Sequence, residues 1–199
     1  MNKQQIKAVK IAAYSLAGIL LCGALGYYNF IYQEPKGSLE IGDTMPNFSV
    51  AKFTLSNGAF EAAEEEYVLY ENENKLRVVN YWATWCGGCI AEMPYFGEFA
   101  AKYPEVQVVA ISRAESRAYE DVCRWLNGNA SVRAWASYPI TFCYDKQDDG
   151  ASKGLYYDLG FSGAMPTTFI VGADGKIKDK ISYEMHSLED VENLVLQYL

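Results

Sequence analysis

The chain has 199 residues, of which 50% are hydrophobic and 15% aromatic, so it can bury a core of ordinary domain size. Its formal net charge of −8 argues against nucleic-acid binding, which requires clusters of Lys and Arg to neutralise phosphates. Five cysteines are too few and too scattered for a small domain held together by disulfides. We therefore expect a globular domain with an acidic, solvated surface.

The N-terminal 33 residues differ in composition from the rest of the chain. Residues 11–32 contain no charged side chain and are numerous enough to cross a bilayer core. Three lysines precede this stretch and the first acidic residue is Glu34, which predicts an N-terminus on the cytoplasmic side. We predict a single-pass membrane anchor over 1–33, a linker over 34–45 and a folded, extracytoplasmic domain over 46–199.

Two other interpretations of the N-terminal segment remain open. Ala24–Gly26 has the small-x-small pattern of a signal-peptide cleavage site, so the segment is alternatively a signal peptide that is removed. Cys22 is alternatively the lipidated cysteine of a lipoprotein, although the bulky Leu21 precedes it where a small residue is typical. All three interpretations export the domain.

The pattern of apolar residues and turn signals predicts the elements of the domain. They are an edge strand at 47–55, an acidic surface segment at 61–75, a buried strand at 76–83, a helix at 89–103 that Pro94 kinks, a buried strand at 105–112, a helix at 115–129, a strand at 138–145, two strands joined by a turn within 165–183, and a helix after Ser187. This order predicts an α/β domain whose mixed sheet is covered by helices on both faces.

Two cysteines follow the buried strand at 76–83 directly, in the sequence CGGC. The carboxyl ends of parallel strands are where such sheets place their chemistry. Because Cys86 precedes a helix, unpaired N–H groups and the helix dipole favour its thiolate. Cys89 lies one turn further on the same face, where it can attack a mixed disulfide formed on Cys86. Gly87 and Gly88 allow the small ring to close without side-chain clashes.

Other uses of this cysteine pair have less support. Structural zinc needs four ligands, and the remaining candidates, Cys123, Cys143 and the single histidine His186, are isolated in the sequence. Copper delivery would also need a histidine near the pair. A purely structural disulfide across so short a loop constrains little chain entropy. The sequence therefore predicts no metal and no cofactor other than a redox-active disulfide between Cys86 and Cys89.

Two motifs together resemble the membrane-anchored thioredoxin-like proteins of the TlpA/ResA type. They are VVNYWATWCGGCIAEMP at 78–94 and GAMPTTFIVGADGKI at 163–177, and the resemblance extends over 41–199. It implies a thioredoxin fold in which Cys86 is the exposed nucleophile and Cys89 is the resolving thiol.

The resemblance also implies a substrate groove beside the disulfide. Pro166 would follow a cis peptide bond and face the two cysteines, and its neighbours would offer backbone groups to a bound peptide strand. The implied groove consists of Trp85, Gly87, Gly88, Met165, Pro166 and Thr167.

The chain departs from thioredoxins proper at Asn80 and at the Gly-Gly dipeptide. Thioredoxins keep a buried acid beneath the cysteines where this chain has Asn80, and a neutral amide cannot accept the proton of Cys89. Glu92 matches an active-site glutamate of ResA-like proteins, and its offset of three residues places it on the helix face of Cys89. The alternative is a surface glutamate on an amphipathic helix. The Gly-Gly dipeptide, with no histidine between the cysteines, favours a reductant.

These residues predict an extracytoplasmic thiol-disulfide oxidoreductase that reduces protein disulfides. The resemblance implies a membrane thiol transporter as electron donor. It implies apocytochromes c, other envelope proteins or an exported methionine sulfoxide reductase as clients. An oxidase or isomerase of the same fold and a non-catalytic redox sensor that binds a partner protein are the alternatives. A peroxiredoxin-like peroxidase is disfavoured because Ala83 stands where its threonine would be.

The remaining cysteines and the histidine have structural interpretations. Cys123 and Cys143 are expected to be core thiols, with a disulfide between them as the alternative. His186 is expected in a loop at the start of the final helix.

Overall fold

The computed structural model describes part of the 199 residues, and the segment predicted as a membrane anchor lies outside that part. The predicted linker is described from residue 38 onward. None of the described helices is both long and apolar enough to span a membrane. The described residues are 38–71, 75–113, 119–130, 132–146, 154–155, 159 and 164–199.

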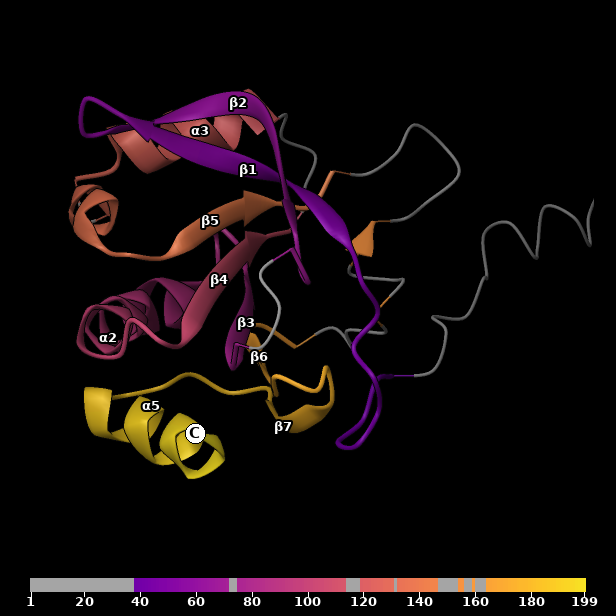
Figure 1. Cartoon of the computed structure of the whole chain (residues 1–199). Coiled ribbons are helices and arrows are strands. Elements are labelled where there is room, and N and C mark those ends of the chain that lie inside the picture. Colours follow the sequence, from indigo (N-terminus) through magenta and orange to yellow (C-terminus); the bar gives the residue numbers. More distant parts are fainter. Residues whose placement is uncertain are drawn as a thin grey trace, which may run out of the picture. The chain divides into compact units, whose positions relative to one another are not determined.

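The described strands form one seven-stranded sheet at the centre of the domain (Figure 1). Its order is β2-β1-β5-β4-β3-β6-β7, in which β3, β4 and β5 run parallel and all other neighbours run antiparallel. The mixed sheet confirms the predicted α/β class. The strands are β1 (Ser49–Ser56), β2 (Ala59–Val68), β3 (Arg77–Trp82), β4 (Gln107–Ser112), β5 (Thr141–Tyr144), β6 (Thr167–Val171) and β7 (Ile177–Ile181).

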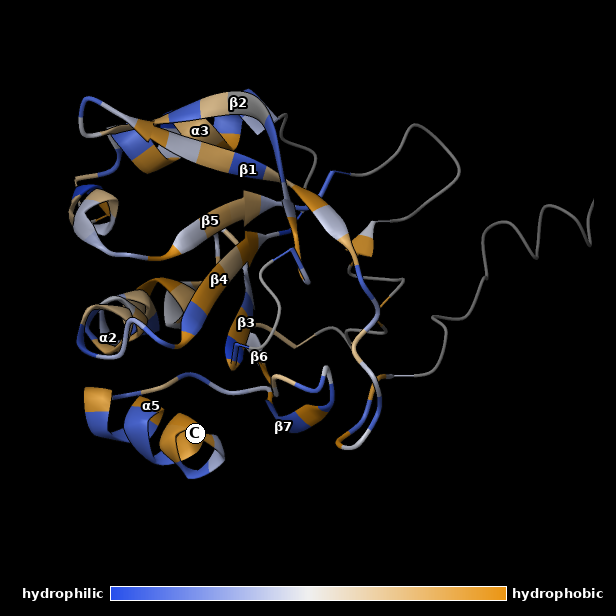
Figure 2. Cartoon of the chain, viewed as in Figure 1, coloured by the Kyte–Doolittle hydropathy of each residue, from blue (hydrophilic) through white to orange (hydrophobic). Residues whose placement is uncertain are grey.

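The interior strand β3 carries apolar side chains on both faces of the sheet. All six of its residues are buried, as expected for a strand between two neighbours with both faces covered. Because side chains alternate along a strand, Val78 and Trp82 join the core on one face, and Val79 and Tyr81 join the core on the other. Figure 2 shows the neighbouring strand β4 as mostly hydrophobic along its length.

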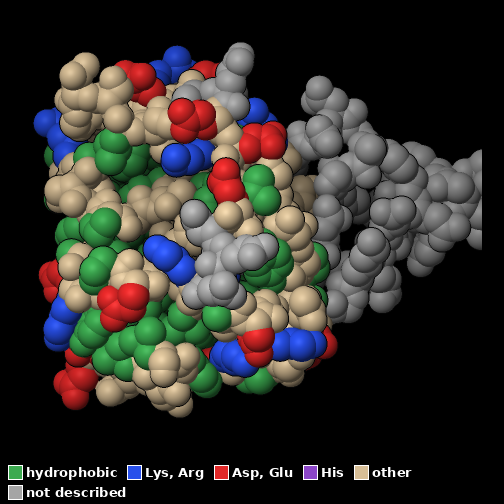
Figure 3. All heavy atoms as spheres, viewed as in Figure 1, with side chains coloured by type: hydrophobic (Ala, Val, Ile, Leu, Met, Phe, Trp, Pro, Cys, Tyr) green, Lys and Arg blue, Asp and Glu red, His purple; other side chains and the backbone are tan. Residues whose placement is uncertain are grey.

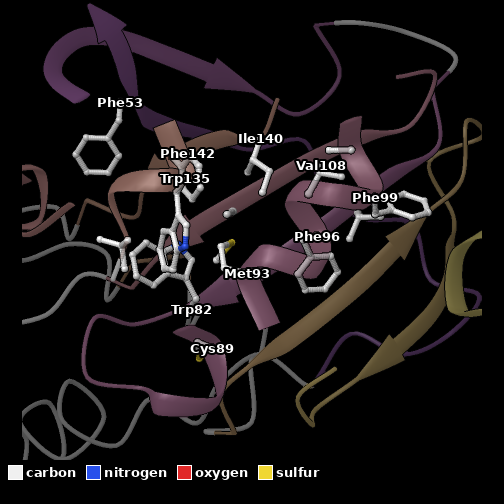
Figure 4. Packing of buried hydrophobic residues seen from close by; sticks show 14 of the residues in the cluster. Phe53, Trp82, Cys89, Met93, Phe96, Phe99, Val108, Trp135, Ile140 and Phe142 are labelled. Atoms are coloured by element: carbon white, nitrogen blue, oxygen red, sulfur yellow. The ribbon is translucent and has the colours of Figure 1, made fainter. Parts of the chain in front are cut away.

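Helices cover the first of these two faces. Three α-helices and one 3-10 helix contribute buried side chains to a single cluster there. Figure 4 shows Met93, Phe96 and Phe99 of α2 in this cluster, with Cys89 at one end of it. The helices are α2 (Gly87–Lys102), α3 (Tyr119–Gly128), η1 (Arg133–Ser137), α5 (Leu188–Val195) and η2 (Leu196–Tyr198).

The second face is covered differently in the described part of the chain. Met45, Phe48 and Leu69 pack there, and Leu159 joins them from a stretch that is otherwise mostly outside the described residues. The sequence predicts helices on both faces, and the described α-helices all pack on the first.

The β1–β2 hairpin differs from the prediction. The sequence predicts an acidic surface segment at 61–75, but the beginning of this segment belongs to β2, which pairs with β1. The edge strand is therefore β2, not β1. Asn57 and Gly58, with φ of 51° and 77°, form the tight turn. Phe60 and Tyr67 are buried, whereas most of the described residues between them are exposed. The exposed glutamates obscure the apolar pattern of a strand in the sequence. An edge strand tolerates such charged residues.

The end of the predicted linker contacts the domain. Within residues 38–45, Thr44 forms an isolated β-bridge with Lys176, and Met45 is fully buried against the second face of the sheet. The chain is therefore attached to the domain before residue 46.

The surface carries mixed charge. Figure 3 shows acidic side chains interspersed with Lys and Arg on the face in view. Two of the described ion pairs join Lys178 to Asp174 at 2.7 Å and Lys102 to Glu192 at 2.6 Å. On this face, acidic and basic side chains are thus neighbours.

Candidate active site

The two cysteines of the CGGC motif lie at the start of α2. Cys86 is the N-cap residue, with φ −86° and ψ 103°, and the helix begins at Gly87, two residues before the predicted start. The N–H of Cys89 donates a hydrogen bond to Sγ of Cys86 at 3.2 Å. The two residues form a disulfide, with their Cα atoms 5.3 Å apart. A thiolate on Cys86 would therefore lie at the positive end of the helix dipole, as the sequence predicts.

The two cysteines differ in exposure. Cys86 is 8% exposed and Cys89 is 0% exposed, so a substrate disulfide can approach Cys86 more readily. Trp85, immediately before the pair, is 61% exposed and forms an apolar flank at the surface. Gly87 is exposed as well, with open space where a side chain would project.

The predicted groove residues after β5 lie at the same end of the sheet. The Met165–Pro166 peptide bond is cis, as the resemblance implied. Thr167 follows it as the first residue of β6 and pairs with Tyr81 of β3. Because β3 leads into the cysteine motif, the cis bond and the disulfide lie beyond the same end of the β3–β6 pair. Pro166 and Thr167 are buried, and Met165 is half-buried.

Glu92 is fully buried, so the alternative of a surface glutamate is wrong. Asn80 donates from Nδ2 to Oε1 of Glu92 at 2.8 Å, and the N–H of Met185 donates to Oε2 at 3.0 Å. Asn80 Nδ2 also donates to Thr168 Oγ1 at 3.0 Å, which fixes the amide between two strands. Burial raises the pKa of Glu92 to about 7, although the two hydrogen bonds favour its carboxylate. A group that exchanges a proton near neutral pH thus lies on the helix of Cys89.

Glu184 also belongs to this site, and sequence reasoning missed it. It lies in the segment between β7 and α5, and its carboxylate packs against Gly88 of the cysteine motif. Its charge helps to raise the pKa of Glu92. Its Oε1 lies 3.6 Å from Nδ1 of His186, and both residues line a pocket of about 350 Å³. No local pattern signals this approach, because it joins two distant parts of the chain.

The comparison with known families agrees with this geometry. A family model described as Redoxin matches residues 40–195. The chain belongs to the Redoxin family.

Two relatives of this Redoxin-family protein have similar lengths. The thiol-disulfide oxidoreductase ResA of Oceanobacillus iheyensis is 30% identical over 183 residues, which cover 89% of this chain and 84% of ResA. The thioredoxin-like protein YneN of Bacillus subtilis is 31% identical over 172 residues, covering 82% of this chain and 86% of YneN. This protein is therefore a thiol-disulfide oxidoreductase of the TlpA/ResA type.

A solved structure supports the fold of this Redoxin-family domain. The thioredoxin domain of a thiol-disulfide oxidoreductase from Bacteroides vulgatus superimposes with a TM-score of 0.58 at 18% identity. The match covers 79% of this chain and 99% of the other. The predicted thioredoxin fold is thereby confirmed.

The other two cysteines of the Redoxin-family domain are free and buried, so the alternative of a bridge between them is wrong. Cys123 belongs to the cluster on the helix-covered face and Cys143 to the cluster on the opposite face. Burial raises the pKa of both thiols. Among the described residues, no three His, Cys, Asp or Glu side chains are grouped to hold a metal ion.

Proposed function

We propose that this protein reduces disulfides of exported proteins, with Cys86 and Cys89 as its redox pair. The observation that supports reduction over oxidation is the lack of a positively charged side chain between the two cysteines. The Sγ of Cys86 accepts the N–H of Cys89, but Gly87 and Gly88 place no positively charged side chain between the two cysteines. Strong oxidants of this superfamily stabilise their reduced form. A dipeptide that adds no such stabilisation favours a lower potential and a reductant.

In the proposed reaction, the Cys86 thiolate attacks one sulfur of a substrate disulfide. A mixed disulfide forms, and the first substrate sulfur leaves as a thiolate that takes up a proton. Cys89 then loses its proton and attacks Sγ of Cys86, which releases the second substrate thiol. Two electrons pass from the enzyme dithiol to the substrate, and the enzyme retains the Cys86–Cys89 disulfide.

We assign the proton acceptor for Cys89 to Glu92. It lies on the same face of α2, three residues beyond Cys89, and it is fully buried. Because burial raises its pKa to about 7, its carboxylate form is available near neutral pH and still basic enough to take a thiol proton. Asn80 holds one carboxylate oxygen in place by its hydrogen bond of 2.8 Å.

The residues around the disulfide would bind an extended substrate segment. Exposed Trp85 supplies apolar contact area, and the backbone beside the cis bond supplies hydrogen-bonding groups. The proposed groove comprises Trp85, Gly87, Gly88, Met165, Pro166 and Thr167.

We further propose that the domain is anchored to the membrane and acts outside the cytoplasm. The support is the uncharged segment 11–32 with lysines before it. Turnover then requires a dithiol donor that re-reduces the enzyme after each cycle, and a thiol transporter in the same membrane fits that requirement. The anchor would keep donor and enzyme close together.

The equilibrium reduction potential of Cys86–Cys89 in the full chain tests the direction. Thioredoxin lies near about −270 mV, disulfide isomerases near about −180 mV and the oxidant DsbA near about −120 mV. We expect a value at or below about −230 mV, by analogy with that scale. A value of about −150 mV or higher would reverse the proposed direction, on the same scale, and indicate an oxidase or isomerase.

A further inference from the structure

Gly88 and Glu184 occupy one space beside the disulfide. A Cβ atom added to Gly88 would overlap Oε2 of Glu184 and lie 3.2 Å from its Cδ. The carboxylate thus fills the volume that a side chain at position 88 would need. Gly87, the other glycine of the dipeptide, has no atom within 4 Å of the corresponding position. The two glycines therefore differ in their surroundings, because a carboxylate occupies the side-chain space of Gly88 and no atom occupies that of Gly87.

The carboxylate lies at the end of α2 where a thiolate would form. The first turn of α2 contains no acidic residue of its own, so Glu184 brings a negative charge to this helix terminus from another part of the chain. A helix N-terminus carries roughly half a positive charge. That partial charge stabilises the thiolate of Cys86, and a carboxylate placed on the same turn offsets it.

Two groups facing Glu184 bear on the size of this effect. Nδ1 of His186, on the same loop, lies 3.6 Å from Oε1 of Glu184. The negative charge of Glu184 also contributes to the raised pKa of Glu92 on α2. The Glu184 side chain is 40% exposed, so solvent screens part of its field. The expected effect is therefore moderate and sensitive to salt.

We propose that Glu184 is a positioning residue that makes the Cys86–Cys89 pair more reducing, and that the lack of a side chain at Gly88 lets its carboxylate lie against the first turn of α2. The inference rests on the proposed redox role of this pair, but it is independent of the direction in which the pair works. It relates Gly88 of the dipeptide to Glu184, a residue of the loop between β7 and α5.

The electron balance shows how the charge acts. When a small dithiol donor reduces the protein, two electrons break the Cys86–Cys89 bond and the donor closes its own disulfide. The two donor protons pass to the protein sulfurs, and Cys86 then releases its proton to solvent to the extent that it ionises. A carboxylate nearby disfavours that ionisation, so the reduced form is less stable and the potential is lower.

The decisive experiment compares Glu184→Gln with Glu189→Gln in the full chain. Both substitutions remove one negative charge, but Glu189 is an exposed residue of the first turn of α5. Each variant is equilibrated with a dithiol/disulfide buffer of known potential. We expect Glu184→Gln to raise the equilibrium constant for reduction about three- to tenfold, where tenfold corresponds to about 30 mV. We expect Glu189→Gln to change it less than about twofold, because an exposed charge is screened.

Gly88→Ala tests the shared space. Its methyl group must displace the carboxylate, so the equilibrium constant should rise in the same direction as in Glu184→Gln. Combining the two substitutions should give no further rise, because the charge is already absent. The inference would be overturned if Gly88→Ala raised the equilibrium constant equally in the unsubstituted protein and in the Glu184→Gln variant. It would also be overturned if Glu184→Gln and Glu189→Gln had the same equilibrium constant. Adding 1 M KCl should reduce the Glu184→Gln effect.

The absolute potential of the unsubstituted protein is read separately. A strongly oxidising value would remove the proposed reductase direction, whereas the difference between Glu184→Gln and the unsubstituted protein tests Glu184 alone.

Discussion

Cys86 and Cys123 are almost equally exposed, at 8% and 7%, and Cys89 and Cys143 are both 0% exposed. Burial therefore does not distinguish the pair that forms a disulfide from the two thiols that remain free. What differs is the backbone around each sulfur. Cys86 ends a loop and caps a helix, whereas Cys123 lies within α3 and Cys143 within β5.

The hydrogen bonds show the consequence of this difference. The Sγ of Cys86 accepts the N–H of Cys89, a contact that favours a thiolate. The Sγ of Cys123 donates to the carbonyl oxygen of Phe60 at 3.1 Å, which it can do only while protonated. Burial raises the pKa of Cys143, which lies inside an apolar cluster. Position at the start of a helix, and not burial, thus distinguishes the redox pair from the two free thiols.

The largest expected effect separates the two groups of cysteines by activity. Cys86→Ser should lower disulfide reductase turnover at least about a thousandfold, because the attacking sulfur is lost. Cys89→Ser should accumulate a mixed disulfide between Cys86 and substrate, because resolution is lost. Cys123→Ser serves as the control and should retain turnover. The measurements are insulin reduction and mass spectrometry of trapped complexes. Substantial turnover by Cys86→Ser would show that Cys86 is not the attacking sulfur.

Cys89 and Cys143 are both fully buried, but only Cys89 is expected to have a proton acceptor, Glu92. Cys89 has Glu92 on its own helix face, whereas Cys143 lies in an apolar cluster. Glu92→Gln should slow resolution of the mixed disulfide about a hundredfold at neutral pH, the range of general-base catalysis. In the unsubstituted protein this rate should rise through pH 7 as the carboxylate forms, given the pKa of about 7. Glu98→Gln, an exposed position on α2, is the matched control.

With Cys89 intact, the reduced protein is mixed rapidly with a substrate disulfide at each pH, and acid quench followed by mass spectrometry measures how fast the transient mixed disulfide decays. Equal pH profiles for Glu92→Gln and Glu98→Gln would remove Glu92 from the mechanism, whatever the role of the cysteines.

Glu92 should also govern the pH dependence of stability. Burial raises its pKa from the ordinary value of 4.5 to about 7, so the folded chain holds a proton that the unfolded chain releases between these values. Its stabilising contribution is fully present below pH 4.5 and is lost as pH rises through 7. The shift corresponds to about 3 kcal/mol. Urea unfolding of the oxidised protein from pH 4 to 8 should show this decline, and Glu92→Gln should lack it. A decline of the same size in both would assign it to other groups.

The sequence predicts the redox pair well because its signals are local. An apolar run followed by CGGC indicates both a central strand and a helix start, and the offset from Cys89 to Glu92 follows from helix periodicity. The cis bond before Pro166 required the family resemblance, because sequence periodicity does not specify peptide isomers. The exposure of Trp85 likewise depends on what packs around it.

Two features escaped sequence reasoning for physical reasons. Strand β2 carries glutamates at its solvent-facing positions, so its two buried aromatic residues do not produce a clear alternation. Glu184 meets Gly88 only after α5 has packed beside α2. Contacts of this kind depend on the three-dimensional arrangement of elements, which no short segment encodes.

The smallest expected effect separates the two free thiols from each other. Cys123→Ser leaves a hydroxyl that can donate to the Phe60 carbonyl, now 3.1 Å from Sγ, so its cost should be less than about 1 kcal/mol. Cys143→Ser places a hydroxyl in an apolar cluster, where the Thr141 carbonyl lies 4.0 Å from Sγ, so its cost should be about 2 kcal/mol.

Urea unfolding of both variants measures these costs, and the reduction potential of Cys86–Cys89 should be the same in each. If Cys143→Ser were as stable as Cys123→Ser, the free thiols would not differ in their hydrogen-bonding surroundings. If either substitution moved the potential, the core thiols would be coupled to the redox pair. The expected result is a difference in stability without a change in potential, because neither free thiol contacts the N-terminus of α2 through any described hydrogen bond.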